Sequence, residues 1–407
     1  MKVGRLVLGI VAVLALVLCG VGAVAASAAQ PTEDVKSLAK GNNAFAFDLY
    51  SVISSGKDNL FLSPYSISSA LAMTYAGAGG NTAAEMASAM HYYLEPDRLH
   101  RSFAALNSAF NAGGKSYRLA VANALWSQIG LNFRPDYAAI TQKYYGAGVR
   151  TVDFVEANEE ARLAINRWVE ENTQNKIVEL LKPGVLNALT RLVLTNAIYF
   201  KGQWKYEFKK DRTENAAFHL SATKTADVPF MNQVAEFGYA ETKDAQVVEL
   251  PYAGGELAMD ILLPRAGSDI AQLEAALGAG GLDPFVSGLY PQKVELSIPR
   301  FKFEAELSLG GALQKLGMID AFSDQRADFS GISDTFLYIT AVIHKAFVEV
   351  NEEGTEAAAA TAVVMGTKSA PVYQPVQFVA DRPFFFVIRD LATGSILFMG
   401  RVTDPRR

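Results

Sequence analysis

The feature that most constrains the fold is the passage from a long β-rich run into a tract of very small residues. Residues 336–350 are largely apolar and rich in β-branched and aromatic side chains, which predicts a buried strand. The chain then passes through Gly354 into four consecutive alanines, Ala357–Ala360, whereas an ordinary surface loop uses residues with turn chemistry. Tiny side chains suit a segment that can be buried in a narrow slot.

Alternation within this tract supports the same interpretation. Successive side chains of a strand point to opposite faces. If the tract formed a strand, Glu356 would point to solvent. The opposite face would carry only small side chains, namely Thr355, Ala357, Ala359 and Thr361.

The tract resembles the hinge of inhibitory serpins, and other segments resemble that family in the same order along the chain. By this resemblance the hinge consists of Gly354, Thr355, Glu356, Ala357, Ala358, Ala359, Ala360 and Thr361. The further matching segments are residues 59–67, 195–202, 218–219, 248–252, 382–384 and 398–402. An ordered set of this kind is much more specific than an isolated alanine-rich tract.

The resemblance implies an α+β fold, with a large central β-sheet, further sheets, several helices and an exposed reactive-centre loop. We expect one serpin domain over residues 29–407, with the reactive-centre loop at about 351–380. Hydrophobic periodicity agrees, because helical spacing dominates the first half and strand patterns dominate after Leu192.

Several element boundaries are also predicted from local patterns. Ser63 and Pro64 have the residue types of a helix N-cap and first turn. Thr82 and Glu85 have capping-box spacing, which predicts that a helix begins there. Residues 161–181 have helical periodicity, and residues 192–200 are apolar at nearly every position, as in a strand covered on both faces.

The first 28 residues predict a secretory signal peptide. A short basic start precedes an apolar run, and small-residue cleavage patterns follow, the best of them ending at Ala28. The alternatives are an uncleaved membrane anchor or lipid modification of Cys19, the only cysteine of the chain. The expectation is therefore a secreted, extracellular protein without disulfides, with membrane anchoring as the alternative.

Charge and motifs exclude several classes of partner. The net charge is −5 and dense runs of lysine or arginine are absent from the sequence, which argues against nucleic acid and against a glycosaminoglycan site. No cofactor or metal site is predicted, and we expect a monomer. The sequence lacks the common hydrolase and phosphate-binding motifs, so we expect that the chain is not an enzyme.

The reactive bond is predicted between Lys368 and Ser369. Lys368 is the only basic residue between Ala346 and Asp381, and counting along the family's hinge from Gly354 reaches the same position. A lysine fits the acidic specificity pocket of trypsin-like proteases. The alternative is that the protease binds Met365 or a neighbouring valine instead.

Five further residues resemble the region where the family's central sheet opens. Ser63, Ser66, Asn196 and His344 come from distant segments and resemble a polar cluster beneath that sheet, while Trp204 resembles a tryptophan near its top. A buried imidazole needs hydrogen-bond partners, which serine and asparagine can supply. The alternative roles are a satisfied core histidine and a packing tryptophan.

The resemblance implies a suicide-substrate inhibitor of trypsin-like serine proteases that traps the acyl-enzyme by inserting its loop into the central sheet. The alternatives are a non-inhibitory serpin that acts as carrier or chaperone, and a hydrolase. Small residues at the inward hinge positions favour insertion, because non-inhibitory members often carry bulky, charged or proline residues there.

Overall fold

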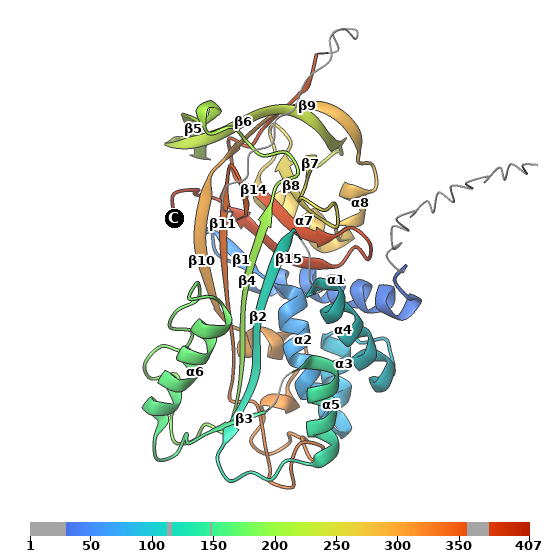
Figure 1. Ribbon diagram of the computed structural model, residues 1–407, viewed down its shortest axis with the longest axis vertical. Coiled ribbons are helices and arrows are strands. Elements are labelled where there is room, and N and C mark those ends of the chain that lie inside the picture. The colour runs from blue at the N-terminus through green and yellow to red at the C-terminus, as the bar shows by residue number, and fades with distance from the viewer. Residues whose placement is uncertain (1–29, 112–115, 147–148, 356–373) are drawn as a thin grey trace, which may run out of the picture. The chain divides into compact units, whose positions relative to one another are not determined.

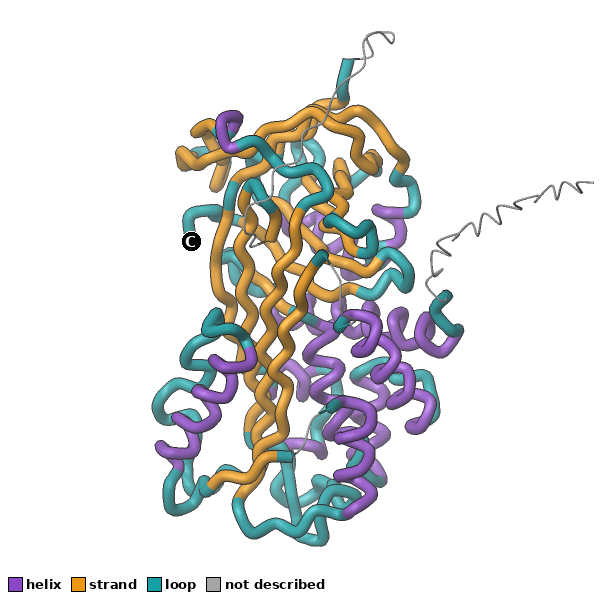
Figure 2. Tube along the Cα trace, in the orientation of Figure 1, coloured by secondary structure: helices purple, strands orange, loops and turns teal. Residues whose placement is uncertain are grey.

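The computed structural model describes residues 30–111, 116–146, 149–355 and 374–407. The chain divides into two units, Met1–Gln30 and Pro31–Arg407, and every described helix and strand belongs to the second. The predicted α+β class is confirmed, because helices pack around two multistranded sheets (Figures 1 and 2).

The helices lie mainly in the first half of the chain. Ser63 is the N-cap of the second helix, its side chain accepts a hydrogen bond from Ser66 N, and Pro64 occupies the first turn, as predicted. The described helices are α1 (Glu33–Ile53), α2 (Pro64–Tyr75), α3 (Gly80–Ala89), α4 (Pro96–Phe110), α5 (Pro135–Tyr145), α6 (Asn158–Asn172), α7 (Ile270–Gly280), α8 (Asp283–Val286) and α9 (Gly310–Lys315), with short 3-10 helices η1 (Lys210–Arg212) and η2 (Asp320–Phe322).

A six-stranded sheet contains the segments that matter for the candidate site. Its order is β10 (Phe301–Ser308), β11 (Ala341–Asn351), β12 (Gly354–Thr355), β4 (Leu192–Gln203), β2 (Tyr117–Gln128) and β3 (Arg150–Val152). β11 and β4 are parallel and pair directly from Ala341↔Val193 to Phe347↔Tyr199, while β12 lies between their far ends.

Both faces of this sheet are covered, which explains the apolar run in β4. On one face, Val193, Ala197 and Tyr199 join a cluster with Ile165 and Val169 of α6. On the other face α2 packs against β2 and β4, and Leu194, Ile198 and Phe200 belong to the main core. Strand β4 therefore has no solvent-facing row, as its sequence predicts.

The second sheet has nine strands among the described residues. The path is β1 (Leu60–Leu62), β15 (Ile396–Val402), β14 (Phe384–Asp390), β8 (Leu257–Pro264), β7 (Ala245–Pro251), β6 (Lys224–Glu241), β9 (Tyr290–Pro299) and β13 (Val376–Val379), and β5 (Glu214–Ser221) pairs with β6. The predicted hairpin near the C-terminus is confirmed as the antiparallel pair β14 and β15.

Two local predictions were wrong. Helix α3 begins at Gly80 after Gly79, and the Thr82 hydroxyl accepts from Asp328 N instead of capping a helix. The contact of Thr82 with Asp328, which is distant in sequence, thus replaces the capping bond that the local pattern predicts. The helix predicted over residues 161–181 ends at Asn172, because Gln174 and Asn175 adopt positive φ angles of 56° and 58°, which break the helix.

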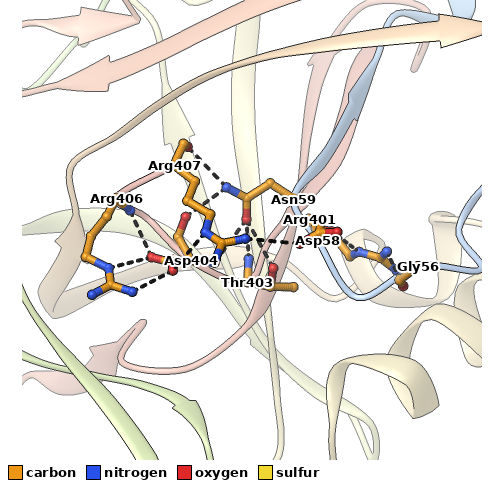
Figure 3. A network of polar contacts seen from close by, with 8 residues as sticks. All are labelled: Gly56, Asp58, Asn59, Arg401, Thr403, Asp404, Arg406 and Arg407. Carbon is orange, nitrogen blue, oxygen red and sulfur yellow. Dashed lines mark hydrogen bonds and ion pairs between the residues drawn. The ribbon is translucent and has the colours of Figure 1, made fainter.

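The C-terminal residues are fixed to the segment that precedes β1 (Figure 3). Asn59 Oδ1 accepts hydrogen bonds from the backbone nitrogens of Thr403 and Asp404 at 2.7 and 3.0 Å, and Asn59 Nδ2 donates to Asp404 O at 2.8 Å. Arg407 and Asp58 form an exposed ion pair at 3.3 Å. One asparagine therefore fastens the end of the chain to its first strand.

Among the helices of the described ranges, none has both the length and the apolar content needed to cross a membrane.

Candidate functional site

The first two residues of the predicted hinge lie between β11 and β4. Gly354 and Thr355 form β12 and pair antiparallel with both neighbours, Gly354 with Gln203 and Asn351, and Thr355 with Gly202 and Val350. A Cβ atom at Gly354 would lie 2.0 Å from Gly202 O, so glycine is required at this position. The backbones of Gly354 and Gly202 lie too close together for any residue with a Cβ atom at position 354.

Thr355 points into the core. It is 1% exposed, and its Oγ1 lies 2.7 Å from the Tyr252 hydroxyl, which is itself fully buried. Burial raises the pKa of Tyr252, so this hydroxyl is neutral and can donate or accept. The inward direction assigned to Thr355 by alternation is the direction that the structure shows.

Trp204 lies at the same end of the sheet. Its ring stacks on Tyr252 with centroids 4.6 Å apart and planes inclined by 17°. The indole Nε1 donates to Asn351 O at 3.0 Å, and the Trp204 backbone nitrogen donates to Glu353 O at 3.0 Å. Trp204 therefore contacts the segment that leads into β12, residues 351–353, and also Tyr252, which binds Thr355.

Two glutamates precede β12, and both are held by cations. Glu352 is 2% exposed and accepts from Arg300 Nε at 2.7 Å and from Thr213 Oγ1 at 2.5 Å. Burial opposes ionisation of Glu352, but the hydrogen bonds from Arg300 and Thr213 outweigh it and hold the pKa of that carboxyl below its usual value. Glu353 pairs with Lys210 at 2.6 Å.

The predicted polar cluster is assembled beneath the middle of the sheet. His344 and Asn196 are register partners across β11 and β4, and His344 Nδ1 bonds to Asn196 Oδ1. The Ser63 backbone nitrogen donates to His344 Nε2 at 3.2 Å, and Asn196 Nδ2 donates to Ser66 Oγ at 2.6 Å. Four residues from three distant segments of the chain therefore form one hydrogen-bonded group.

Burial determines the charge state of this cluster. It lowers the pKa of His344 to about 3, so the imidazole is neutral at physiological pH. Because Nε2 accepts from Ser63 N, the proton is on Nδ1 and is donated to Asn196. The cluster is therefore a set of neutral hydrogen bonds that connects α2, β4 and β11.

Sequence reasoning missed several residues of the site. Asn123 of β2 bonds to Asn196 and donates to Ser66 O at 3.1 Å, so it completes the cluster. Arg300, Thr213 and Tyr252 contact the segment before and within β12. Their side chains are ordinary in type, and only their proximity to residues 352–355 identifies them.

The remaining predicted site residues lie outside the described residues. These are Lys368 and Ser369 of the predicted reactive bond and the hinge residues Glu356, Ala357, Ala358, Ala359, Ala360 and Thr361. Within the described ranges, no group of three or more histidine, cysteine or acidic side chains could hold a metal ion.

Comparison with known proteins identifies a family that covers nearly the whole second unit. The matching family model is described as serpin (serine protease inhibitor) and covers residues 40–405. The chain is 43% identical to the human leukocyte elastase inhibitor over 91% of this chain and 100% of that protein. It is 43% identical to human serpin B8, over 90% of this chain and 99% of that protein.

A solved structure agrees with these relatives. The crystal structure of Serpin48 from the insect Tenebrio molitor superposes with a TM-score of 0.83 at 34% identity. The match covers 91% of this chain and 98% of that chain. Sequence and fold thus point to the same family.

The comparisons contradict the prediction of a secreted, extracellular protein. The human leukocyte elastase inhibitor and serpin B8 are intracellular serpins and match this chain over nearly all of their own length, which points against secretion. The prediction rested on residues 1–28, which lie outside the described residues. An apolar run with small residues reports hydrophobicity alone, and that property is not specific to export.

Proposed function

This chain belongs to the serpin family of serine protease inhibitors, and on that premise we propose that it traps trypsin-like serine proteases as a suicide substrate. The protease attacks the carbonyl carbon of Lys368 and releases Ser369 as a new amino terminus. The acyl-enzyme then persists because the freed hinge inserts into the six-stranded sheet. Trypsin-like specificity follows from the single basic residue of the loop, which fits a pocket with a carboxylate at its base.

The observation that carries the proposal is the register of β12. Its two residues already pair with both β4 and β11, so any further insertion continues an existing pattern. Thr361 lies six residues after Thr355 and would fall opposite Asn196 on β4 and His344 on β11, each six residues before the present partner. Insertion would therefore separate the Asn196–His344 bond and place a threonine hydroxyl between the two side chains.

The hinge composition is compatible with this path. The residues that would follow Thr355 on the inward face are Ala357, Ala359 and Thr361, which need little volume. Glu356 would lie on the opposite face, level with Lys201. Loop insertion in serpins adds a strand to the sheet and releases strain stored in the intact fold, and this release supplies the force that displaces the attached protease.

In this mechanism the chain is not an enzyme, because each molecule is consumed when it traps one protease. It acts as a monomer, since one loop and one sheet in the same chain suffice. A non-inhibitory carrier or chaperone, or a hydrolase, would leave the protease active and would form no covalent complex.

A second candidate specificity has support from the relatives. Human leukocyte elastase inhibitor is named for elastase, and the loop contains Val363, Val364 and Met365 a few residues before Lys368. Elastase has a small apolar specificity pocket, so it would cleave after one of these residues. The two candidates share the insertion mechanism and differ only in the bond that is attacked.

One experiment distinguishes these possibilities. Residues 29–407 are mixed with trypsin, with elastase and with chymotrypsin, and complexes that survive denaturing electrophoresis are measured. We expect a complex with trypsin whose carboxy-terminal fragment begins at Ser369, and Lys368→Ala should abolish it without unfolding the protein. A fragment that begins at Val364, Met365 or Gly366 would establish the elastase-type bond, and turnover without any complex would contradict inhibition.

A further inference from the structure

Three polar side chains form a series of hydrogen bonds on the surface, where the turn that follows α3 meets α1. Asp48 Oδ2 lies 2.6 Å from His91 Nε2, and His91 Nδ1 lies 2.9 Å from the Tyr93 hydroxyl. Tyr93 is 63% exposed, and the His91 side chain is 26% exposed. The side chains of Asp48, His91 and Tyr93 are called the surface triad. A carboxylate, an imidazole and an accessible phenol thus follow one another within hydrogen-bond distance.

The chemistry of the partners gives the direction of both hydrogen bonds. A carboxylate can only accept, so in the neutral ring His91 Nε2 carries the proton and donates to Asp48. Nδ1 is then the acceptor, and the Tyr93 hydroxyl donates to it. His91 is therefore placed to take the proton of the phenol, and Asp48 is placed to stabilise the imidazolium that results.

The backbone holds His91 in a conformation that favours glycine. Helix α3 ends in a Schellman motif, in which His91 N donates to Ser88 O at 3.2 Å and Tyr92 N donates to Ala87 O at 2.9 Å. His91 occupies the position of this motif that has positive φ, here 53°, where glycine is usual. Uncommon backbone conformations that the surrounding structure maintains are concentrated at functional sites.

Helix α1 contacts this turn at two points on one face. A Cβ atom at Gly41 would collide with the carbonyl oxygen of His91, so the backbone of the turn lies directly against the helix. About two helical turns further along α1, Asp48 binds the imidazole ring. Tyr92, between His91 and Tyr93, is buried. Contacts on both sides of the ring and beneath the turn therefore position the surface triad.

A second histidine–tyrosine pair shows what distinguishes the surface triad. His100 Nδ1 lies 2.6 Å from the Tyr145 hydroxyl, but His100 is only 3% exposed. Burial lowers the pKa of His100 to about 4, so its ring is a weak proton acceptor. The pair of His91 and Tyr93 differs because its phenol is open to reagents and its imidazole is bonded to a carboxylate.

We propose that Tyr93 is an acyl-acceptor site, with His91 as its general base and Asp48 as the residue that positions His91. The phenol oxygen attacks the carbonyl carbon of an activated ester while the phenol proton moves to His91 Nδ1. The bond between the carbonyl carbon and the leaving group then breaks, and the leaving group departs as an anion. The imidazolium returns its proton to water, so the step needs neither an oxidant nor a reductant.

The product limits which acyl donors can react. Acylated Tyr93 is an aryl ester, and it forms favourably only when the leaving group is a weaker base than the phenolate of tyrosine. Acyl phosphates and esters of acidic phenols meet this condition, whereas esters of ordinary alcohols do not. The reaction is a modification that adds one acyl group to Tyr93. It is independent of the reactive-centre loop and goes beyond the proposed function.

The test uses p-nitrophenyl acetate and compares two tyrosines within the same molecule. Tyr290 is 56% exposed and is the internal reference, because no histidine of the described residues bonds to it. After short exposure to the reagent, acetylation of each tyrosine is measured by mass spectrometry of the peptides. We expect Tyr93 to be acetylated at least about tenfold faster than Tyr290.

Two variants identify the source of this reactivity. His91→Gly removes the base but keeps the turn, because glycine adopts positive φ freely, and it should reduce the rate at Tyr93 to that at Tyr290. Asp48→Asn leaves the base without its carboxylate and should give an intermediate rate. The rate at Tyr290 should be the same in all three proteins, whereas a general loss of structure would change it.

Equal acetylation rates at Tyr93 and Tyr290 in the wild type would overturn the inference. A rate at Tyr93 that stays fast in His91→Gly would also overturn it, because exposure alone would then account for the reactivity. The measurement uses no protease. Failure of this inference therefore leaves the proposed function intact, and failure to trap a protease would leave this inference intact.

Discussion

The hydroxyl groups of Thr355 and Tyr252 lie 2.7 Å apart in the core, at the point where the hinge enters the six-stranded sheet. Tyr252 stacks in turn on Trp204. The indole nitrogen of Trp204 donates a hydrogen bond to Asn351 O, and its backbone nitrogen donates one to Glu353 O. The first inward residue of the hinge is therefore already satisfied by a buried partner. The proposed insertion begins from this position.

A charge at an inward hinge position should convert the inhibitor into a substrate. In Thr355→Arg the guanidinium would replace a side chain that is 1% exposed, and an unpaired buried charge is strongly unfavourable. Insertion slows, so the acyl-enzyme hydrolyses first. We expect trypsin to cleave this variant and remain active, whereas the control Glu356→Gln keeps the inhibitory stoichiometry. A stable complex of Thr355→Arg at the wild-type stoichiometry would contradict insertion.

Cleavage of the loop near Lys368 should raise thermal stability. The inserted strand adds ladder hydrogen bonds on both sides, with β4 and β11, and buries the inward face of the hinge. Melting of the intact and nicked protein by calorimetry measures the difference. We expect a midpoint higher by more than about 10 °C, and Thr355→Arg serves as the control that gains less. An unchanged midpoint would favour a carrier-type serpin.

Stability should fall as the pH drops below about 6.5, and His344 should account for part of the loss. Burial lowers the pKa of His344 to about 3 and that of His100 to about 4, against 6.5 in the unfolded chain. The unfolded state therefore binds protons that the folded state does not. Stabilisation by the neutral rings is complete above pH 6.5 and is lost as the pH falls toward these values.

At pH 5 each of these two histidines should cost about 2 kcal/mol of unfolding free energy relative to pH 7. Urea unfolding of the wild type and of His344→Gln at both pH values checks this. The variant is less stable at pH 7 but should lose less on acidification. An identical loss in both proteins would show that His344 does not titrate on unfolding.

Replacement of Arg300 should destabilise the segment that precedes β12, because Arg300 binds Glu352. Glu352 is buried and, among the residues that the structure describes, would keep only the Thr213 hydroxyl, at 2.5 Å, as a side-chain donor. Because Arg300 is partly exposed, we expect Arg300→Ala to lower the free energy of unfolding by about 1–2 kcal/mol. The matched control is Lys302→Ala, which breaks an accessible pair with Glu349 and should change stability by less than about 0.5 kcal/mol. Equal effects of the two substitutions would contradict a special role for Glu352.

Replacement of Asn59 should loosen the C-terminal residues. Asn59→Ala removes the acceptor for two backbone nitrogens and the donor to Asp404 O (Figure 3). We expect a loss of about 1–3 kcal/mol in chemical denaturation, with faster hydrogen exchange at Thr403. Arg406→Ala, which removes the pair between the half-exposed Arg406 and Asp404 but leaves the bonds of Asn59 in place, is the control and should cost less. An unchanged hydrogen-exchange rate at Thr403 would show that Asn59 does not hold the C-terminal residues in place.

The local pattern of residues was sufficient for many elements. Alternating or continuous apolar residues predict β4, the C-terminal hairpin and the strand that becomes β11, because side-chain period reports which faces are covered. Ser63 and Pro64 mark the start of α2 by capping chemistry that acts within four residues. The inward direction of Thr355 likewise follows from alternation alone.

The relations among these elements required the tertiary structure. Thr82 has the residue type of a cap but bonds to Asp328, which is 246 residues away in sequence. Asn123 meets Asn196 only because β2 is the neighbour of β4, and Arg300 meets Glu352 only because β10 lies beside β11. Strand order and register depend on contacts between distant segments. Short-range periodicity determines which faces of this chain are apolar, whereas the free energy of packing all of them together decides which residues meet.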